Sequence, residues 1–236
     1  MMWLMGEVED VVVDSGMSKT LHSGLRVLEV LSSHSEGMTI TEVAAAVGVH
    51  RTVAHRFLRT LEAHRLVRRD RAKRYHPGAG LVPLAEPIER DLRTAALPML
   101  EELADTVGAT AHLVAQEDAE RVRALMVVEP RRASVHVAFR PGQLDLIDRG
   151  SAGLAILSAQ PARPGEREEV TTARERGYAV SFSEVIPSVH GISAPVRVHR
   201  DGAPLSVGVS VFDLGDVAST GAAVVATATQ LARVAG

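Results

Sequence analysis

Residues 50–78 read HRTVAHRFLRTLEAHRLVRRDRAKRYHPG, and this stretch decides the fold of the N-terminal part of the chain. Its first half predicts a helix over residues 51–64, because apolar side chains recur there at helical spacing. The buried stripe is expected to comprise Ala54, Phe57, Leu58 and Leu61. Its second half predicts two short strands around a basic turn. A helix followed by a basic β-hairpin is the typical C-terminal part of a winged helix-turn-helix domain.

The residues before this stretch supply the two preceding helices of such a domain. A helix is expected over residues 19–33 and a shorter one up to Val47, capped by Thr39 or Thr41. Gly48 supplies a tight turn, and we expect Ala44 and Gly48 to let two helices cross closely. The buried stripe of the first helix is expected to comprise Leu21, Leu25, Leu28 and Leu31.

The polar side of the third helix carries the side-chain types that read DNA. Arginine grips guanine or phosphate, and shorter polar groups make closer contacts. The expected DNA-binding residues are His50, Arg51, Thr52, His55, Arg56 and Arg59 on the helix, with Arg69, Arg71, Lys73 and Arg74 on the wing. The wing residues suit the phosphate backbone or the minor groove. The alternative is an amphipathic helix with a solvated arginine face.

Charge divides unevenly along the chain, whose formal net charge is −3. Residues 18–78 carry a net charge of about +6, so the remainder carries about −9. A basic segment on an acidic chain suits a polyanion-binding module joined to something else, although a solvated charged surface has the same composition.

The remainder of the chain predicts a helical linker and a mixed domain. Prolines interrupt a helical pattern over residues 81–107, and from residue 109 short strands alternate with helices. Strands are expected at 111–115, 122–128, 134–139, 178–182, 192–198 and 205–212, and helices at 151–158, 167–176 and 217–234. Asp201-Gly202 signals a two-residue hairpin turn. This pattern predicts a mainly antiparallel sheet.

The fold class is therefore α+β: a winged helix-turn-helix, a helical linker and a C-terminal α/β domain. The expected parts are a flexible tail at 1–16, the DNA-binding domain at 17–79, the linker at 80–107 and the last domain at 108–236.

Composition excludes several function classes. The chain has no cysteine, so disulfides, cysteine-bound zinc and a cysteine nucleophile are excluded. No apolar run approaches the roughly 20 residues that span a bilayer, and the acidic N-terminal segment does not read as a secretory signal. We expect a cytoplasmic protein without a cofactor. The histidines His112, His136, His190 and His199 show no metal-ligand spacing, so no metal is expected.

The segment from Leu21 to Gly78 resembles the DNA-binding half of the IclR family of bacterial regulators, with Gly48-Val49 and His55-Arg56-Phe57-Leu58 among the matching residues. The resemblance continues in residues 149–157 and in Gly191-Ile192-Ser193-Ala194-Pro195-Val196. It implies a GAF-like effector domain, a homodimer or dimer of dimers, and control of a metabolic gene cluster, with repression the expected outcome. Among the departures, Arg65 stands where the family usually has glycine, and Leu154 replaces a frequent lysine.

The resemblance also implies an effector site. Its expected residues are Ser151, Ala152, Ser181, Glu184, Gly191, Gly208 and Ser210. Ser210 and Gly208 alternate with valines, so they share one face of a strand. The backbone N–H groups of a helix that starts near Gly150 would bind an anion, which makes an organic acid the expected effector. The alternative is an ordinary turn with Ser151 as the helix N-cap and Glu184 as a surface carboxylate.

Two other functions stay open. Ser181, Ser188, His190 and Asp213 are residue types of a hydrolytic site, but no enzyme motif accompanies them, so we expect no enzyme. A second alternative is a DNA-binding protein whose C-terminal domain only mediates assembly. In the main interpretation, a dimer binds a palindromic operator in double-stranded DNA, and the effector acts through the linker.

Overall fold

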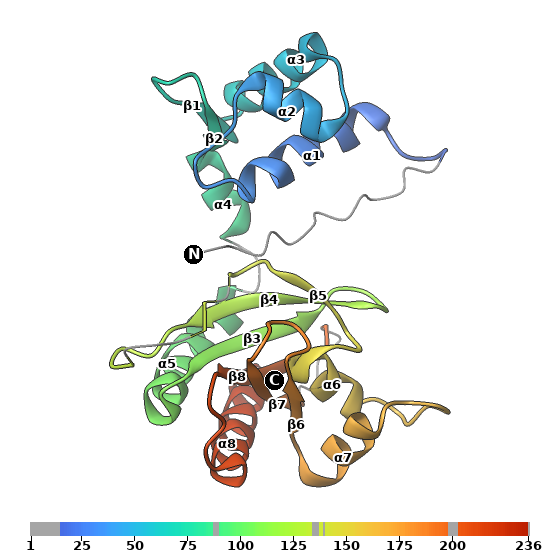
Figure 1. Cartoon of the computed structure of the whole chain (residues 1–236), viewed down its shortest axis with the longest axis vertical. Helices are drawn as coiled ribbons and strands as arrows, with labels where there is room; N and C mark the ends of the chain where they lie inside the picture. The colour runs from blue at the N-terminus through green and yellow to red at the C-terminus, as the bar shows by residue number, and fades with distance from the viewer. Residues whose placement is uncertain (1–14, 87–89, 134–136, 139, 198–202, 236) are drawn as a thin grey trace. The chain divides into compact units, whose positions relative to one another are not determined.

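The computed structural model describes residues 15–86, 90–133, 137–138, 140–197 and 203–235 (Figure 1). The chain forms two compact units that divide between residues 88 and 89. Each unit has its own hydrophobic core, so each is treated as a separate body.

The first unit is a winged helix-turn-helix, as predicted. Its elements are α1 (Lys19–Ser32), α2 (Ile40–Val47), α3 (Arg51–Ala63), β1 (Val67–Arg69) and β2 (Tyr75–Pro77). The two strands pair antiparallel, and the short helices η1 (Ala79–Leu81) and α4 (Val82–Ala85) follow them.

Local capping sets the ends of α2. Thr39 is its N-cap: the Thr39 hydroxyl accepts from the Glu42 N–H, and the Glu42 carboxylate accepts from the Thr39 N–H. Gly48 ends α2 in the left-handed conformation, with φ of 69°. A Cβ at Gly48 would meet nothing within 4 Å. The expectation that Gly48 makes room for a close helix crossing is therefore wrong, and its backbone angle explains the glycine instead.

The buried face of α1 differs from the prediction. Leu21 and Leu25 are 63% and 50% exposed, whereas Val27 and Leu31 are fully buried. The helix packs on α2, α3 and β2 through the Val27 side, because the core cluster gathers Val27, Val30 and Leu31 with residues of those elements. Of the predicted stripe, Leu31 is buried and Leu28 packs partly against this cluster.

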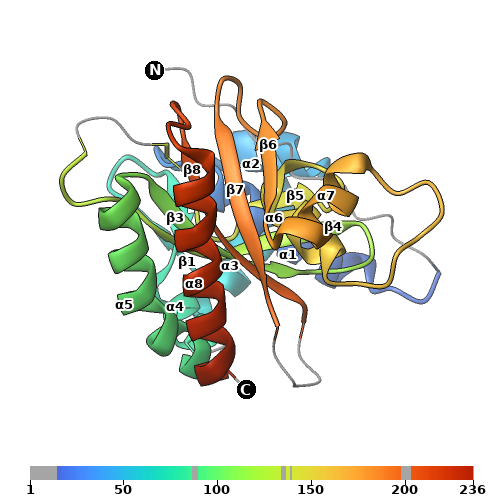
Figure 2. The same ribbon diagram turned by 90° about the horizontal axis from the view of Figure 1, so that it is seen from below.

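The second unit is a six-stranded antiparallel sheet with helices on both faces. Its strands are β3 (Thr110–Gln116), β4 (Arg121–Val128), β5 (Leu144–Leu146), β6 (Ala179–Phe182), β7 (His190–Val196) and β8 (Leu205–Val211). Their order across the sheet is β5-β4-β3-β8-β7-β6. The helices are α5 (Arg90–Val107), α6 (Gly150–Ser158), α7 (Glu168–Arg176) and α8 (Val217–Ala235). Helices α5 and α8 lie side by side across the sheet (Figure 2).

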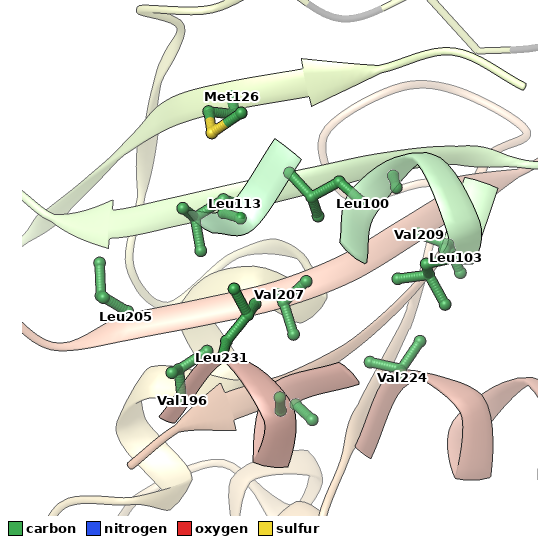
Figure 3. Close-up of a cluster of buried hydrophobic side chains, with 14 of the residues drawn as sticks. Leu100, Leu103, Leu113, Met126, Val196, Leu205, Val207, Val209, Val224 and Leu231 are labelled. Carbon is green, nitrogen blue, oxygen red and sulfur yellow. The ribbon is translucent and has the colours of Figure 1, made fainter. Parts of the chain in front are cut away.

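The main core lies between the sheet and α5 with α8. Leu100 of α5, Leu113 of β3, Val207 of β8 and Leu231 of α8 are buried together there (Figure 3). The larger part of the segment that was expected as a linker, residues 90–107, therefore belongs to the core of the second unit.

The opposite face of the sheet carries small polar residues. Thr110, Ser210, Gly191 and Ser181 lie in register across β3, β8, β7 and β6. Their neighbours Val207 and Val209 alternate to the other face and pack in the main core, as predicted. Helix α6 covers this polar face beside β3 and β4, where Val114, Val122 and Ile156 pack together. Small side chains under a helix leave room for a ligand.

Some predicted features lie outside the described residues: most of the strand at 134–139, with His136, and the hairpin turn at 201–202, with His199. Among the described residues, no helix combines the length and the apolar character that a bilayer crossing demands.

Candidate DNA interface and effector pocket

The outer face of α3 presents polar side chains. Its exposed residues include Arg51, Thr52, His55, Arg56 and Arg59, whereas Ala54 and Leu58 are fully buried. Phe57 and Leu61 pack partly against the core, so the predicted stripe faces inward. His50 is the N-cap of α3, and its Nδ1 accepts from the Thr52 N–H at 3.3 Å. The sequence did not indicate this second role for His50.

The wing turn is built on Asp70. The Asp70 Oδ1 accepts from the Arg74 N–H at 2.8 Å, and its Oδ2 lies 2.9 Å from Nε2 of His76. These contacts hold the pKa of Asp70 below its usual value, with the His76 contact the largest cause. Arg71 and Lys73 are exposed at the tip, and Arg69 lies over the Tyr75 ring at 5.3 Å. A hydrogen-bonded turn thus presents exposed cations, which suits contact with phosphates.

Arg74 has a structural role that the sequence did not show. Its Nε donates to the carbonyl oxygens of Glu36 and Gly37, at 2.9 and 3.1 Å, and its Nη2 reaches Glu42 at 3.4 Å. Arg74 therefore ties the wing to the loop between α1 and α2. The guanidinium is only half-exposed, so it is less available to DNA than Arg71.

Arg65 adopts the left-handed conformation, with φ of 60°, at the turn after α3. The family resemblance predicts glycine here, and the backbone keeps the glycine geometry. The Arg65 carbonyl accepts from the Gly80 N–H at 2.9 Å, and a Cβ at Gly78 would lie 2.3 Å from that same oxygen. Two glycines thus allow the chain to pass closely behind an arginine in a strained conformation.

A pocket of about 550 Å³, counted out to its open mouth, lies on the polar face of the sheet at the start of α6. Of the predicted effector residues, Ser151, Ala152, Ser181, Glu184, Gly191 and Ser210 line it. Gly208 does not line it, although it shares a face of β8 with Ser210: a Cβ at Gly208 would meet Ser193 and His112, so these side chains cover it. The remaining wall includes Val114, Val122, Ala124, Val185, Ile186 and Val189.

Serines in and behind the pocket wall form hydrogen bonds with one another. The Ser151 N–H donates to Ser181 Oγ at 2.9 Å, and the hydroxyls of Ser151 and Ser193 lie 2.8 Å apart. A Cβ at Gly191 would lie 2.5 Å from Ser151 Oγ, so this close packing requires glycine. Arg149, not Ser151, is the N-cap of α6, and the alternative of Ser151 as N-cap is wrong.

Glu184 closes one side of the pocket. Its Oε2 accepts from the Gly150 N–H at 2.9 Å, and its two carboxylate oxygens accept from Arg167 at 3.0 and 2.9 Å. The Arg167 guanidinium is the main reason that the pKa of Glu184 lies below its usual value. Glu184 is only partly exposed and lines the pocket, which argues against the alternative of a simple surface carboxylate. An acidic side chain of the protein already occupies the N-terminus of α6.

Three polar residues of the pocket were not predicted from the sequence: His112, Asp145 and Arg149. His112 of β3 is buried, and burial lowers its pKa to about 4, so the ring is neutral at neutral pH. Asp145 of β5 also lines the pocket, and burial raises its pKa. Alternation along a strand predicts that Asp145 points to the opposite face from Leu144 and Leu146. It does not predict that this face lines a pocket.

Among the described residues, no three His, Asp or Glu side chains form a group that could hold a metal ion. Leu154, which departs from the family pattern, is fully buried with Val170 between α6 and α7 and lies outside the pocket.

Comparisons with known proteins agree with this arrangement. The family model of the IclR helix-turn-helix domain matches residues 20–71. The probable HTH-type transcriptional regulator ArcR of Halobacterium salinarum is 24% identical, over 84% of this chain and 85% of its own. The IclR transcriptional regulator of Alicyclobacillus acidocaldarius is 26% identical, with a TM-score of 0.78 over 93% of this chain and all of its own. An IclR homolog of Microbacterium hydrocarbonoxydans, solved with 4-hydroxybenzoate, has a TM-score of 0.78 at 19% identity, over 92% of this chain and 98% of its own.

A winged helix-turn-helix joined to a pocket-bearing antiparallel sheet defines a DNA-binding transcriptional regulator, not an enzyme. Residues 20–71 match the IclR helix-turn-helix domain, and the chain as a whole is similar to IclR-type transcriptional regulators.

Proposed function

We propose that this regulator changes its affinity for DNA when a small metabolite binds in the pocket beside α6. The observation that carries the proposal is the pocket itself, which is lined by small serines and glycine and by residues of the loop that follows β6. The IclR homolog solved with 4-hydroxybenzoate supports the existence of such a site, because it shares this fold.

The proposed DNA target is a palindromic operator bound by a homodimer or a dimer of dimers. Two copies of α3 would read two half-sites, so operator symmetry follows the symmetry of the protein. Exposed Leu21 and Leu25 on α1 support self-association, since they are apolar side chains left in solvent in the single chain. We propose that the result is repression, exerted in the cytoplasm.

Linkage provides the test. If the effector and DNA sites are coupled, a compound that shifts the DNA affinity by some factor must itself bind more or less tightly to the DNA complex by the same factor. A metabolite library is screened by thermal shift with the full chain, and hits are added to the protein–operator complex. Hits that leave DNA affinity unchanged would contradict the coupling, and a library without hits would favour a domain that only mediates assembly.

A further inference from the structure

Asp145 places a carboxylate in an otherwise apolar part of the pocket wall. It lies on β5 opposite Val122 of β4, and cross-strand partners share a face of the sheet. Val122, Val114 and Ala124 form that wall and pack in the cluster below α6. The carboxylate is half-buried, and the burial is what raises its pKa.

The partner of Asp145 is neutral. The Gln143 Nε2 lies 3.1 Å from each carboxylate oxygen of Asp145. Throughout the described parts of the chain, no lysine, arginine or histidine forms an ion pair with Asp145. Arg149 also lines the pocket, but its side chain is exposed at the mouth. A carboxylate accepts about four hydrogen bonds, so Asp145 keeps acceptor capacity for a ligand.

The anion-binding position of the pocket is already filled. The Gly150 N–H donates to Glu184 and the Ser151 N–H donates to Ser181 Oγ. Arg167 neutralises Glu184 through two contacts and also binds the Asp148 carbonyl, so its guanidinium is engaged on several sides. A ligand that enters therefore meets the Asp145 carboxylate, which has no ion-pair partner among the described residues, together with serine hydroxyls and the exposed Arg149.

On the basis of the proposed effector site, we propose that Asp145 determines its specificity and selects an uncharged or cationic small molecule that donates a hydroxyl or amino hydrogen to it. A ligand without a donor would exclude water from the carboxylate and leave it unsatisfied. An anionic ligand would add a like charge at close range in a partly desolvated site. A donor forms a charge-assisted hydrogen bond, which is the stronger kind. The organic acid that the sequence suggested is thereby disfavoured.

The test uses matched probes that differ only in one substituent. One series is 4-hydroxybenzyl alcohol, 4-hydroxybenzylamine and 4-hydroxybenzoate. The other is glycerol, 2-amino-1,3-propanediol and glycerate. Dissociation constants are measured by calorimetry with the full chain at neutral pH, for the wild type, for Asp145→Asn and for the control Asp148→Asn. Asp148 is an exposed acid near the pocket that does not line it.

In at least one series we expect the alcohol or amine to bind the wild type at least about tenfold more tightly than the carboxylate. Asp145→Asn should weaken binding of the amine about tenfold, so that its affinity advantage over the carboxylate becomes smaller or reverses. Asp148→Asn should leave the order of the three affinities as in the wild type.

Tighter binding of the carboxylate to the wild type would overturn this inference and leave the effector site standing. An alcohol or amine preference that survives Asp145→Asn would overturn the assignment to Asp145. If neither series binds and a broad metabolite library gives no thermal shift, the proposed function fails and this inference fails with it.

Discussion

The carboxylate of Glu184 accepts a hydrogen bond of 2.9 Å from the backbone N–H of Gly150, at the first turn of α6. The two residues are 34 positions apart in sequence, and Arg167 fixes the same carboxylate from α7's N-terminal side. The loop after β6 is thereby fastened to the start of α6, whose first residues line the pocket. One side chain therefore contacts both the first turn of α6 and the residue that precedes α7.

Glu184→Ala should lower the free energy of unfolding by about 1–3 kcal/mol, because the Gly150 N–H and the Arg167 guanidinium lose a charged partner. Urea unfolding of the full chain, followed by circular dichroism, measures this loss. The control is Glu175→Ala, which removes an exposed acid of α7. Equal losses in the two variants would contradict the fastening role of Glu184.

His112 makes stability depend on pH. Its pKa in the folded protein is about 4, below the ordinary value of 6.5, so the unfolded chain binds more protons between these values. Its neutral form therefore favours folding above about pH 6.5, and that contribution declines as the pH falls toward 4. From pH 7 to pH 5 the wild type should lose about 2 kcal/mol more stability than His112→Gln. The same difference for the partly buried His190→Gln would contradict this assignment.

Arg65→Gly should stabilise the DNA-binding unit by about 1 kcal/mol, because glycine adopts positive φ without the cost that a Cβ brings. Arg65→Ala keeps the Cβ and should give little gain. Thermal unfolding of both variants measures the difference. Equal stabilisation by alanine would mean that the arginine side chain, and not the backbone conformation, causes the strain.

Arg51 and Arg71 are expected to act on DNA in different ways. Arg51 begins the exposed face of α3, so Arg51→Ala should relax base preference at one operator position. Arg71 lies at the wing tip, so Arg71→Ala should weaken binding to all DNA sequences alike. It should also reduce, by about one, the slope of the logarithm of the binding constant against the logarithm of the salt concentration. Binding to a set of single-base operator variants distinguishes them. An equal loss of affinity for every operator variant in Arg51→Ala would contradict the assignment of Arg51 as a base-reading residue.

The exposed leucines of α1 test self-association. Leu21→Ser combined with Leu25→Ser should shift the chain toward monomer in light scattering and weaken operator binding by at least about tenfold. Glu36→Ser, an exposed change outside α1, is the control. An unchanged oligomer would place the contact elsewhere.

The sequence was sufficient where local periodicity decides the structure. The stripe of α3, the basic hairpin and the alternation of Ser210 with valines were all readable from spacing of two or about four residues. The prediction failed for α1, because a leucine-rich helix face gives the same sequence pattern whether it packs in the core or lies on the surface of the single chain. It also failed for Arg74 and Asp145, whose roles depend on residues brought together by tertiary folding, such as Gly37 beside the wing.

The central claim is that the N-terminal unit binds a specific operator. Fluorescence anisotropy with DNA from the gene's own upstream region, at several salt concentrations and beside a scrambled fragment, tests it most directly. We expect tight binding to the native fragment, weaker binding to the scrambled one, and a loss of affinity for both as the salt concentration rises. Failure to bind either fragment at low salt would contradict it.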